Sequence, residues 1–290
     1  MENLRGSLFM VLAMGAFSLE DMFIKAAANS VPVGEILILF GLGGTLAFML
    51  LTRQRGEVIL HPAILTKPIL IRAICEVTGR LCFALAIILT PISSASAILQ
   101  ATPLVVVMGA AIIFGEKVGW RRWTAIFIGL VGVLLIIRPG LDGFEPASLF
   151  AVLGTLGFAG RDLATRAAPP VLSNMQLGVY GFFILIPTGM AMLLQSGGVV
   201  WIDLTSAMQI FAATVIGVGA YYALTVAMRT GEVSVVTPFR YTRLLFALVV
   251  GVIVFAERPD TLTLIGSAII VAGGVYTLLR SRSKQASPAT

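Results

Sequence analysis

Two arginines in the stretch PFRYTRLLF, residues 238–246, offer the clearest chemistry in the sequence. Arg240 and Arg243 are three residues apart, so on a helix they share one face. The surrounding sequence is apolar over about twenty residues, which is the length that spans a bilayer. A guanidinium stays charged and presents a planar fork that suits carboxylate or phosphate, so the pair predicts anion recognition at membrane depth. The alternative is an internal salt bridge to one of three acidic residues, Glu20, Asp21 or Glu76.

Three further charged residues follow one another at four-residue steps on one predicted helix and therefore share a face. They are Arg72, Glu76 and Arg80. Arg80 is about twelve residues, or roughly 18 Å, into its apolar segment, which is near the middle of a bilayer. It forms either a structural pair with Glu76 or part of a cavity wall in which Glu76 orients it toward an anion. Arg72 is close to the start of the segment, and its side chain is expected to reach the headgroups.

Acidic residues near the ends of two predicted helices suggest gating or coupling. Asp21 precedes Lys25 by four residues and Asp162 precedes Arg166 by four, a spacing that allows a salt bridge within each helix. These pairs are either charge-paired helix ends or symmetric gates near the two mouths of a transport path. Glu20 is a candidate for coupling to a proton or cation.

Uncharged polar residues at membrane depth complete the candidate site. Gln100 and Thr102 lie in the predicted fourth apolar segment, where they hydrogen-bond either a ligand or a neighbouring helix. Tyr221 and Tyr241 either contact the organic part of a ligand or pack between helices.

Composition places the whole chain in a membrane. It has 290 residues, of which 58% are hydrophobic and 12% charged, against about 25% charged residues in soluble domains. We expect an all-α membrane protein with ten transmembrane helices, the first of them retained and not cleaved as a signal peptide. The expected spans are 6–27, 32–52, 68–89, 93–114, 120–138, 147–167, 173–195, 206–228, 234–255 and 261–280.

The distribution of charge predicts the orientation. The net charge is +6, but the positive residues are scattered between apolar runs and form no stripe that would bind nucleic acid. If the N-terminus is cytoplasmic, thirteen lysines and arginines, Arg161 among them, fall on the cytoplasmic side and three on the other. Cytoplasmic loops carry the excess of positive charge, so both termini are expected in the cytoplasm.

An internal repeat divides the chain. Residues 6–28 align with residues 147–169 at an offset of 141, with nine of twenty-three positions identical. The same offset relates FGEK to FAER, where Glu116 and Glu257 end corresponding helices. Each unit holds five predicted spans, an odd number, so the second enters the membrane in the opposite sense. We therefore expect two inverted-topology five-helix repeats, residues 1–141 and 142–282, followed by a cytoplasmic tail, 283–290.

The sequence resembles the EamA family of the drug/metabolite transporter superfamily. The resemblance rests on the two five-helix repeats, on the Gly/Ala-Glu pairs that end each fourth helix, and on the segments GLVGVLLI and VAGGVYTLL. The stretch PFRYTRLLFALVVGVIVFAERPD is similar to a bacterial subgroup associated with S-adenosylmethionine uptake, and the family also includes riboflavin carriers. The resemblance implies a central cavity that faces each side of the plasma membrane in turn. The second half departs from the first, with Leu244 in place of Pro103 and with both added arginines.

Other functional classes receive little support from the residues. His61 is the only histidine, and HExxH, GxSxG and P-loop motifs are missing, which argues against an enzyme, a resident cofactor or a metal site. Cys75 and Cys82 are about 10.5 Å apart along one helix, too far for a disulfide, and are expected to be packing residues. A channel, a scaffold or a lipid-modifying enzyme stays as a less favoured alternative.

These observations together predict a secondary transporter in the bacterial inner membrane. It would move a small, amphipathic metabolite with an anionic group by alternating access, as a monomer or homodimer in the lipid bilayer. S-adenosylmethionine is one candidate substrate, because its carboxylate and sulfonium suit a cavity with arginine and glutamate. An exporter of amino acids or drugs and a riboflavin-type carrier are the alternatives. Glu20 and Glu76 are the candidate coupling groups.

Overall fold

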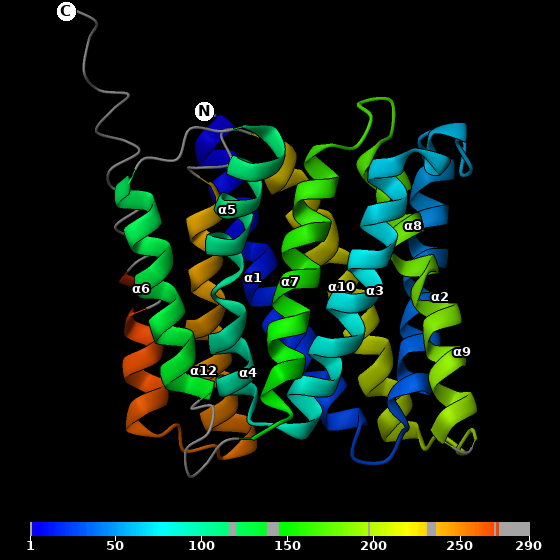
Figure 1. Ribbon diagram of the computed structural model, residues 1–290. Coiled ribbons are helices and arrows are strands. Elements are labelled where there is room, and N and C mark those ends of the chain that lie inside the picture. The colour runs from blue at the N-terminus through cyan, green and yellow to red at the C-terminus, as the bar shows by residue number, and fades with distance from the viewer. Residues whose placement is uncertain are drawn as a thin grey trace, which may run out of the picture.

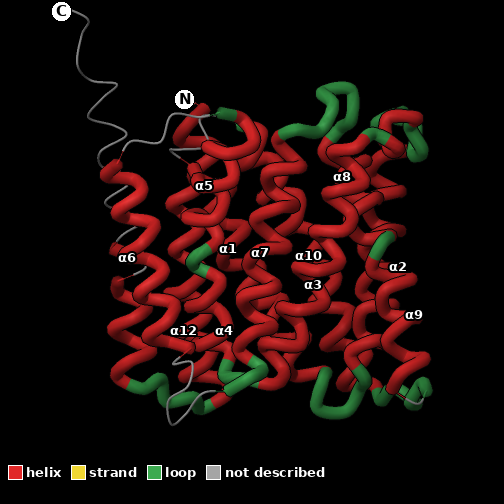
Figure 2. The backbone as a smooth tube through the Cα atoms, viewed as in Figure 1, coloured by secondary structure: helices red, strands yellow, loops and turns green. Residues whose placement is uncertain are grey.

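A computed structural model describes residues 2–115, 120–137, 145–196, 198–230, 236–269 and 271–272. In those residues the secondary structure is helical, without a strand (Figure 2). The helices lie side by side with their axes roughly parallel, and the chain runs back and forth between two faces of the bundle (Figure 1). Before α12 they are α1 (Glu2–Ala27), α2 (Val33–Gln54), η1 (Pro62–Leu65), α3 (Lys67–Leu89), α4 (Ile92–Leu99), α5 (Thr102–Phe114), α6 (Trp120–Ile137), α7 (Ser148–Arg166), α8 (Asn174–Phe183), α9 (Leu185–Ser196), α10 (Leu204–Arg229) and η2 (Thr237–Tyr241). Helix α12 (Thr242–Phe255) and a helix over residues 261–269 follow.

The distribution of polar residues is that of a membrane protein. Leu12 and Phe211 on the outside are 65% and 70% exposed, whereas Glu20 in the interior is fully buried. Charged groups stay inside because lipid cannot solvate them. Five stretches are long and apolar enough to cross a membrane, namely Leu4–Ala27, Val33–Gln54, Ile92–Phe114, Asn174–Leu194 and Leu204–Arg229. The chain is thus a multi-pass helical membrane protein, while the number of ten spans stays a prediction.

Two of the expected spans contain a break. Helix α4 ends at Leu99 and α5 begins at Thr102, because Pro103 lacks the N–H that would continue the ladder. The Thr102 hydroxyl donates to the Leu99 carbonyl at 2.6 Å, which satisfies an acceptor at the break. Helices α8 and α9 meet in the same way, just before Pro187.

Glycines let α3 and α7 approach closely. A Cβ atom added at Gly157 would lie 2.4 Å from the backbone nitrogen of Gly79, so neither position accommodates a side chain without a shift of the helices. Phe83 of α3 and Phe158 of α7 pack edge to face, with ring centroids 5.9 Å apart. Small residues at such crossings favour tight helix association in membranes. This contact holds Arg80 and Arg161 on neighbouring helices.

Helices from the two halves of the sequence pack against each other. Helix α1 lies along α10, α3 along α7, and α2 against α8 and α9. The last contact is aromatic, because Phe182 of α8 contacts Phe40 and Phe48 of α2 at centroid distances of 5.0 and 5.6 Å. Each half therefore completes its packing only with helices of the other.

Helices α5 and α12 end in matching caps. Gly115 and Ala256, which are 141 residues apart, both adopt a left-handed conformation, with φ of 66° and 50°. In each cap the backbone N–H bonds to the carbonyl five residues earlier, in Ala110 and Gly251 respectively. A left-handed alanine is disfavoured by about 1–2 kcal/mol. Ala256 nevertheless adopts the same left-handed cap as Gly115.

Replacing Gly157 by alanine tests the close approach of α3 and α7. We expect Gly157→Ala to destabilise the protein by about 1–3 kcal/mol, because the added methyl meets backbone that has no room to rotate away. Thermal unfolding in detergent measures the effect. Gly219→Ala is the matched control, since a Cβ there meets nothing within 4 Å. Equal stability of the two variants would contradict the contact.

Candidate functional site

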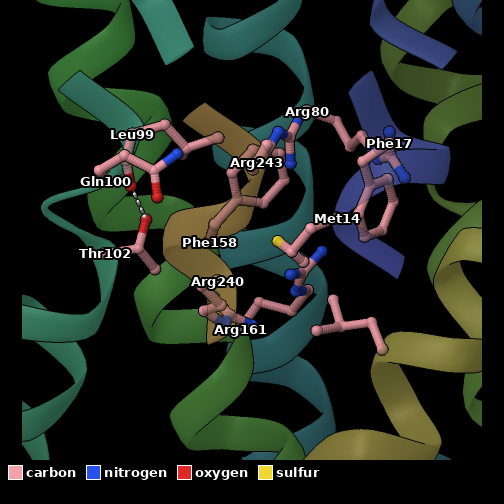
Figure 3. A pocket seen from close by; sticks show the side chains of 11 residues that line it. Met14, Phe17, Arg80, Leu99, Gln100, Thr102, Phe158, Arg161, Arg240 and Arg243 are labelled. Carbon is pink, nitrogen blue, oxygen red and sulfur yellow. Dashed lines mark hydrogen bonds between the residues drawn. The ribbon is translucent and has the colours of Figure 1, made fainter. Parts of the chain in front are cut away.

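Four arginines from four different elements converge on one cavity. Figure 3 shows Arg80 of α3, Arg161 of α7, Arg240 of η2 and Arg243 of α12 around it. The empty space among the lining residues is about 440 Å³, counting the part that opens outward. The other lining residues are Gln100 and Thr102 and the apolar residues Met14, Phe17, Leu99, Phe158 and Leu224. The cavity thus has a cationic wall and an apolar wall.

Two carboxylates of α1 hold two of these arginines. Asp21 accepts a hydrogen bond from Arg243 at 2.5 Å, and Glu20 forms an ion pair with Arg80. Both acids are almost completely buried. Neither lines the cavity, so they support the arginines from behind. The salt bridge to Asp21 was the alternative expected for Arg243, and it is present.

Two further carboxylates complete the layer behind the cavity. Asp162 of α7 lies 2.6 Å from Arg240 and 3.0 Å from Arg161. Glu76 of α3 lies 3.5 Å from Arg161 and 3.6 Å from Arg80. Arg240 thus pairs with Asp162, which was not among the three acidic residues expected as its partners. Every carboxylate of this layer contacts at least one guanidinium of the cavity wall.

Aromatic rings flank the guanidinium groups. The ring of Phe17 lies between Arg80 and Arg243, at 5.6 and 5.2 Å from their guanidinium carbons. Arg243 also lies 5.1 Å from the ring of Phe83, and Arg161 lies 4.8 Å from that of Phe158. Cation–π contacts of this kind stabilise a desolvated guanidinium. The rings cover the flat sides of the guanidinium groups, so the N–H groups at their edges form the polar part of the wall.

Two helix N-termini add to the positive potential. Helix α5 begins at Thr102 and α12 at Thr242, next to the cavity-lining Arg243. The backbone N–H groups of a helix N-terminus attract anions. Helix α5 begins after the break that follows α4, whereas α12 continues directly from η2.

Several guanidinium nitrogens keep hydrogen-bonding capacity. Within the described part of the chain, Arg80 Nη2, Arg240 Nε and Arg243 Nε are buried without a hydrogen-bond partner. All three side chains are more than nine-tenths buried. Unpartnered buried donors are costly, so an acceptor placed in the cavity would be held strongly.

A second layer corrects the expectation for Arg72. Its side chain does not reach the headgroups but is 2% exposed, inside the bundle. Its Nε donates to the Thr165 hydroxyl at 3.0 Å, and its Nη2 bonds to the hydroxyl of Tyr221. Tyr221 in turn donates to Glu76 at 2.9 Å. The lateral partners on α7 and α10 keep Arg72 inside, although its position along the helix would have allowed it to reach the surface.

The two tyrosines expected at the ligand do not line the cavity. Tyr221 belongs to the network behind Glu76, and Tyr241 is buried without a hydrogen-bond partner for its hydroxyl among the described residues. The aromatic residues of the wall are instead Phe17 and Phe158. Gln100 lines the cavity as expected, although its amide also bonds to the Ser96 carbonyl at 3.3 Å.

The expected salt bridges are replaced by other ion pairs. Asp21 pairs with Arg243 of α12 instead of Lys25, whereas Asp162 pairs with Arg240 of η2 and with Arg161, its neighbour on α7. Both aspartates lie in the buried interior, and their role as gates stays a prediction.

Arg161 is a charged cavity residue that the sequence did not predict. It was counted with the cytoplasmic charges, yet it is 5% exposed and lines the cavity. Its place inside the span 147–167, and opposite Glu20 in the repeat, was the signal that could have identified it.

Glu257 closes one end of the bundle. It accepts hydrogen bonds from the backbone N–H groups of Ile92 and Ser93, and so caps α4, while Lys25 lies 3.2 Å away. Burial raises the pKa of Glu257, but these hydrogen bonds and that of the Ser93 hydroxyl bring it below its usual value. The cap therefore adds stability that is lost only as the pH falls through this lowered pKa. Glu116 lies outside the described residues.

A resident metal has no obvious ligands here. The described residues contain no cluster of three or more His, Cys, Asp or Glu side chains that could hold one. Cys75 and Cys82 are free and half-buried.

Comparisons with known proteins agree with this architecture. The model of the EamA-like transporter family matches residues 4–138 and again residues 146–279. The pseudopaline exporter CntI of Pseudomonas aeruginosa is 27% identical over 97% of both chains. A riboflavin transporter of Rhizobium johnstonii is 27% identical over 69% of this chain and 66% of its own length. An S-adenosylmethionine uptake transporter of Rickettsia prowazekii is 21% identical over 69% and 67%.

A solved structure supports the fold. This crystal structure is 19% identical to the chain and covers 99% of both chains with a TM-score of 0.69. At that identity the likeness concerns the fold alone.

Tyr221→Phe tests the second layer. The change removes the hydroxyl that joins Arg72 to Glu76, so we expect a loss of about 1–3 kcal/mol in the free energy of unfolding, measured in detergent. Tyr222→Phe is the matched control, because Tyr222 is only half-buried. If Tyr221→Phe were as stable as the control, the Tyr221 hydroxyl would not be what stabilises the buried Arg72.

Proposed function

Because this chain belongs to the EamA-like transporter family, we propose that it is a secondary active transporter of a small, amphipathic metabolite with an anionic group. The observation that carries the proposal is the cavity, whose polar wall is made of four arginines. Its apolar wall suits the organic part of such a molecule. Transport by alternating access would expose this cavity to each side of the plasma membrane in turn.

The same proposal includes ten spans in two inverted repeats, residues 1–141 and 142–282, with both termini in the cytoplasm. Three features support it. The family model matches each half once, the caps at Gly115 and Ala256 are 141 residues apart, and the contact of α1 with α10 mirrors that of α7 with α3. An odd number of spans in each half reverses the second half relative to the first.

In this mechanism the arginines bind the anionic group. Arg243, Arg240 and Arg80 offer the donors that lack partners, and Gln100 and Thr102 lie on the opposite helix break. The carboxylates Glu20, Asp21, Glu76 and Asp162 are the candidates for coupling, because a bound anion competes with them for the arginines. Tyr221 supports the site from behind through its hydrogen bonds with Arg72 and Glu76, and Tyr241 acts as a packing residue.

The relatives suggest candidate substrates. Their names cover S-adenosylmethionine, riboflavin and pseudopaline, and they include both uptake and export. The pseudopaline exporter matches the whole chain, which makes export as good a candidate as uptake. Inverted carriers run in the direction that the gradients set, so substrate and direction need separate measurements.

Counterflow in proteoliposomes tests the proposal directly. Vesicles containing the purified chain and preloaded with S-adenosylmethionine, riboflavin, an amino acid mixture or dicarboxylates would each be offered the corresponding labelled compound. Saturable, trans-stimulated uptake of an anionic compound supports the proposal. Saturable uptake confined to compounds without an anionic group would contradict the anion site.

Arg243→Ala is expected to abolish uptake of an anionic substrate. The change removes one of the four arginines that line the cavity. It also leaves Asp21 buried without this partner, which destabilises the fold by about 3–5 kcal/mol. Uptake must therefore be measured together with thermal stability and membrane insertion.

The variant Arg243→Met/Asp21→Asn separates the two effects. It removes the pair as a whole, which in proteins is often close to neutral for stability. We expect it to fold and to lose uptake, whereas a purely structural pair predicts normal uptake. Arg243→Lys keeps the charge without the planar fork, so its activity measures the need for bidentate recognition.

A further inference from the structure

One polar cluster joins four helices at the end of the bundle where α1 ends. Lys25 of α1 donates to the carbonyl of Thr90, the C-cap of α3, at 3.0 Å, and lies 3.2 Å from Glu257, which follows α12. Glu257 accepts hydrogen bonds from the backbone N–H groups of Ile92 and Ser93, in the first turn of α4, at 2.7 and 3.1 Å. Together Lys25, Thr90, Ile92, Ser93 and Glu257 form the end cluster.

The four helices that meet in the end cluster also line the cavity. Phe17 of α1, Arg80 of α3, Leu99 of α4 and Arg243 of α12 all belong to the cavity wall. Lys25 lies eight residues beyond Phe17 in the sequence, which is about 12 Å further along α1. The end cluster therefore ties the helices of the wall together at one end of the space that they enclose.

Helices α2, α8 and α9 differ from these four, because they contribute no described residue to the cavity wall. They lie together at one edge of the bundle (Figure 1). Glu35 of α2 accepts from the backbone N–H of Val200 at 3.1 Å, and Gln176 of α8 donates to the Val58 carbonyl at 2.7 Å. These contacts hold loops in place at a distance from the cavity, so they provide controls for the role of the end cluster.

The opposite end of the bundle carries an equivalent of part of the end cluster. The offset of 141 residues relates Lys25 to Arg166 and Phe255 to Phe114. Lys25 lies 5.1 Å from the ring of Phe255, and the guanidinium carbon of Arg166 lies 5.3 Å from the ring of Phe114. Phe114 is 38% exposed, whereas the side chains of Lys25 and Glu257 are 17% and 10% exposed. The contact of Arg166 with Phe114 is thus less buried than the end cluster.

We propose that the end cluster is a gate, which must open for a ligand to pass between the cavity and this face of the bundle. The contact of Arg166 with Phe114 is the equivalent gate at the other face. The proposal rests on the proposed function and assigns contacts that alternating access must break. A passage at this end requires α1 to separate from α12, and this separation breaks the ion pair of Lys25 with Glu257. Charge-assisted hydrogen bonds are about twice as strong as neutral ones, so they favour the closed arrangement.

Labelling of a thiol in the cavity measures the gate without a substrate. Leu99→Cys, combined with Cys75→Ser and Cys82→Ser, places a single thiol in the wall. Right-side-out and inside-out membrane vesicles each expose one face to a charged methanethiosulfonate reagent, which does not cross the bilayer. We expect Lys25→Met to raise the labelling rate from the face of the end cluster about tenfold, a factor that corresponds to about 1.4 kcal/mol lost from the closed state. An unchanged rate from that face would overturn the proposal.

Two further variants separate a gate from a general loosening of the bundle. Glu35→Gln is the matched control, because Glu35 also binds a backbone N–H near this face but belongs to a helix outside the cavity wall. It should leave the labelling rate unchanged, and an equal rise in this variant would contradict a specific gate. Arg166→Met should raise the rate from the opposite face only. If Lys25→Met lowers the thermal stability without faster labelling, the end cluster is a helix cap and the proposal fails.

Cross-linking shows whether the end cluster must open during transport. In the background without Cys75 and Cys82, Lys25→Cys/Glu257→Cys would be joined by a reducible bifunctional thiol reagent. Counterflow should stop when the pair is joined and return after reduction. The control pair is Glu57→Cys/Ser173→Cys, because these side chains bond to each other between the loop after α2 and the start of α8. This link should leave counterflow intact.

The outcomes distinguish failure of the gate from failure of the proposed function. Faster labelling of the Lys25→Met variant without counterflow of any compound would contradict the proposed transport and leave the gate standing. Counterflow that continues while the Lys25→Cys/Glu257→Cys pair is joined would overturn the gate and leave the proposed transport intact.

Discussion

The structure depends on keeping five guanidinium groups inside a membrane-embedded bundle. Each charge at the centre of a bilayer is unfavourable by about 2.5–3.5 kcal/mol on insertion scales, so the arginines require partners within the protein. Several of these partners come from other helices. Asp21 joins α1 to α12, Glu20 joins α1 to α3, and Asp162 joins α7 to η2. The ion pairs therefore connect helices that the chain separates widely, and they determine which faces of those helices turn inward.

The order of the layers gives the site its character. The carboxylates lie behind, the guanidinium groups stand in front, and aromatic rings fill the spaces between them. Such an order stabilises the arginines without using all of their hydrogen bonds. The starts of α5 and α12 bring two helix N-termini to the same region. Positive potential thus arises from side chains and backbone together, in a space that is also partly apolar.

The sequence predicted the positions along each helix better than the contacts between helices. The apolar runs located the helices, of which five stretches are long and apolar enough to cross a membrane, and the offset of 141 anticipated the matching ends of α5 and α12. Spacing also placed Arg80 and Arg243 at membrane depth. It could not show that Arg72 turns toward Tyr221, or that Arg240 meets Asp162, because these partners lie 149 and 78 residues away. Lateral neighbours follow from the packing of the whole bundle, which one-dimensional periodicity does not contain.

The packing of glycines between α3 and α7 bears on how the two halves of the sequence are joined. The backbones of α3 and α7 are in contact at Gly79 and Gly157, and α1 also packs closely along α10. Both contacts join one half of the sequence to the other. The closest contacts therefore form mixed pairs of helices, each with one member from either half of the sequence. The ion pair of Glu20 with Arg80 joins α1 of one mixed pair to α3 of the other, so a buried charge pair links the two most tightly packed parts of the bundle.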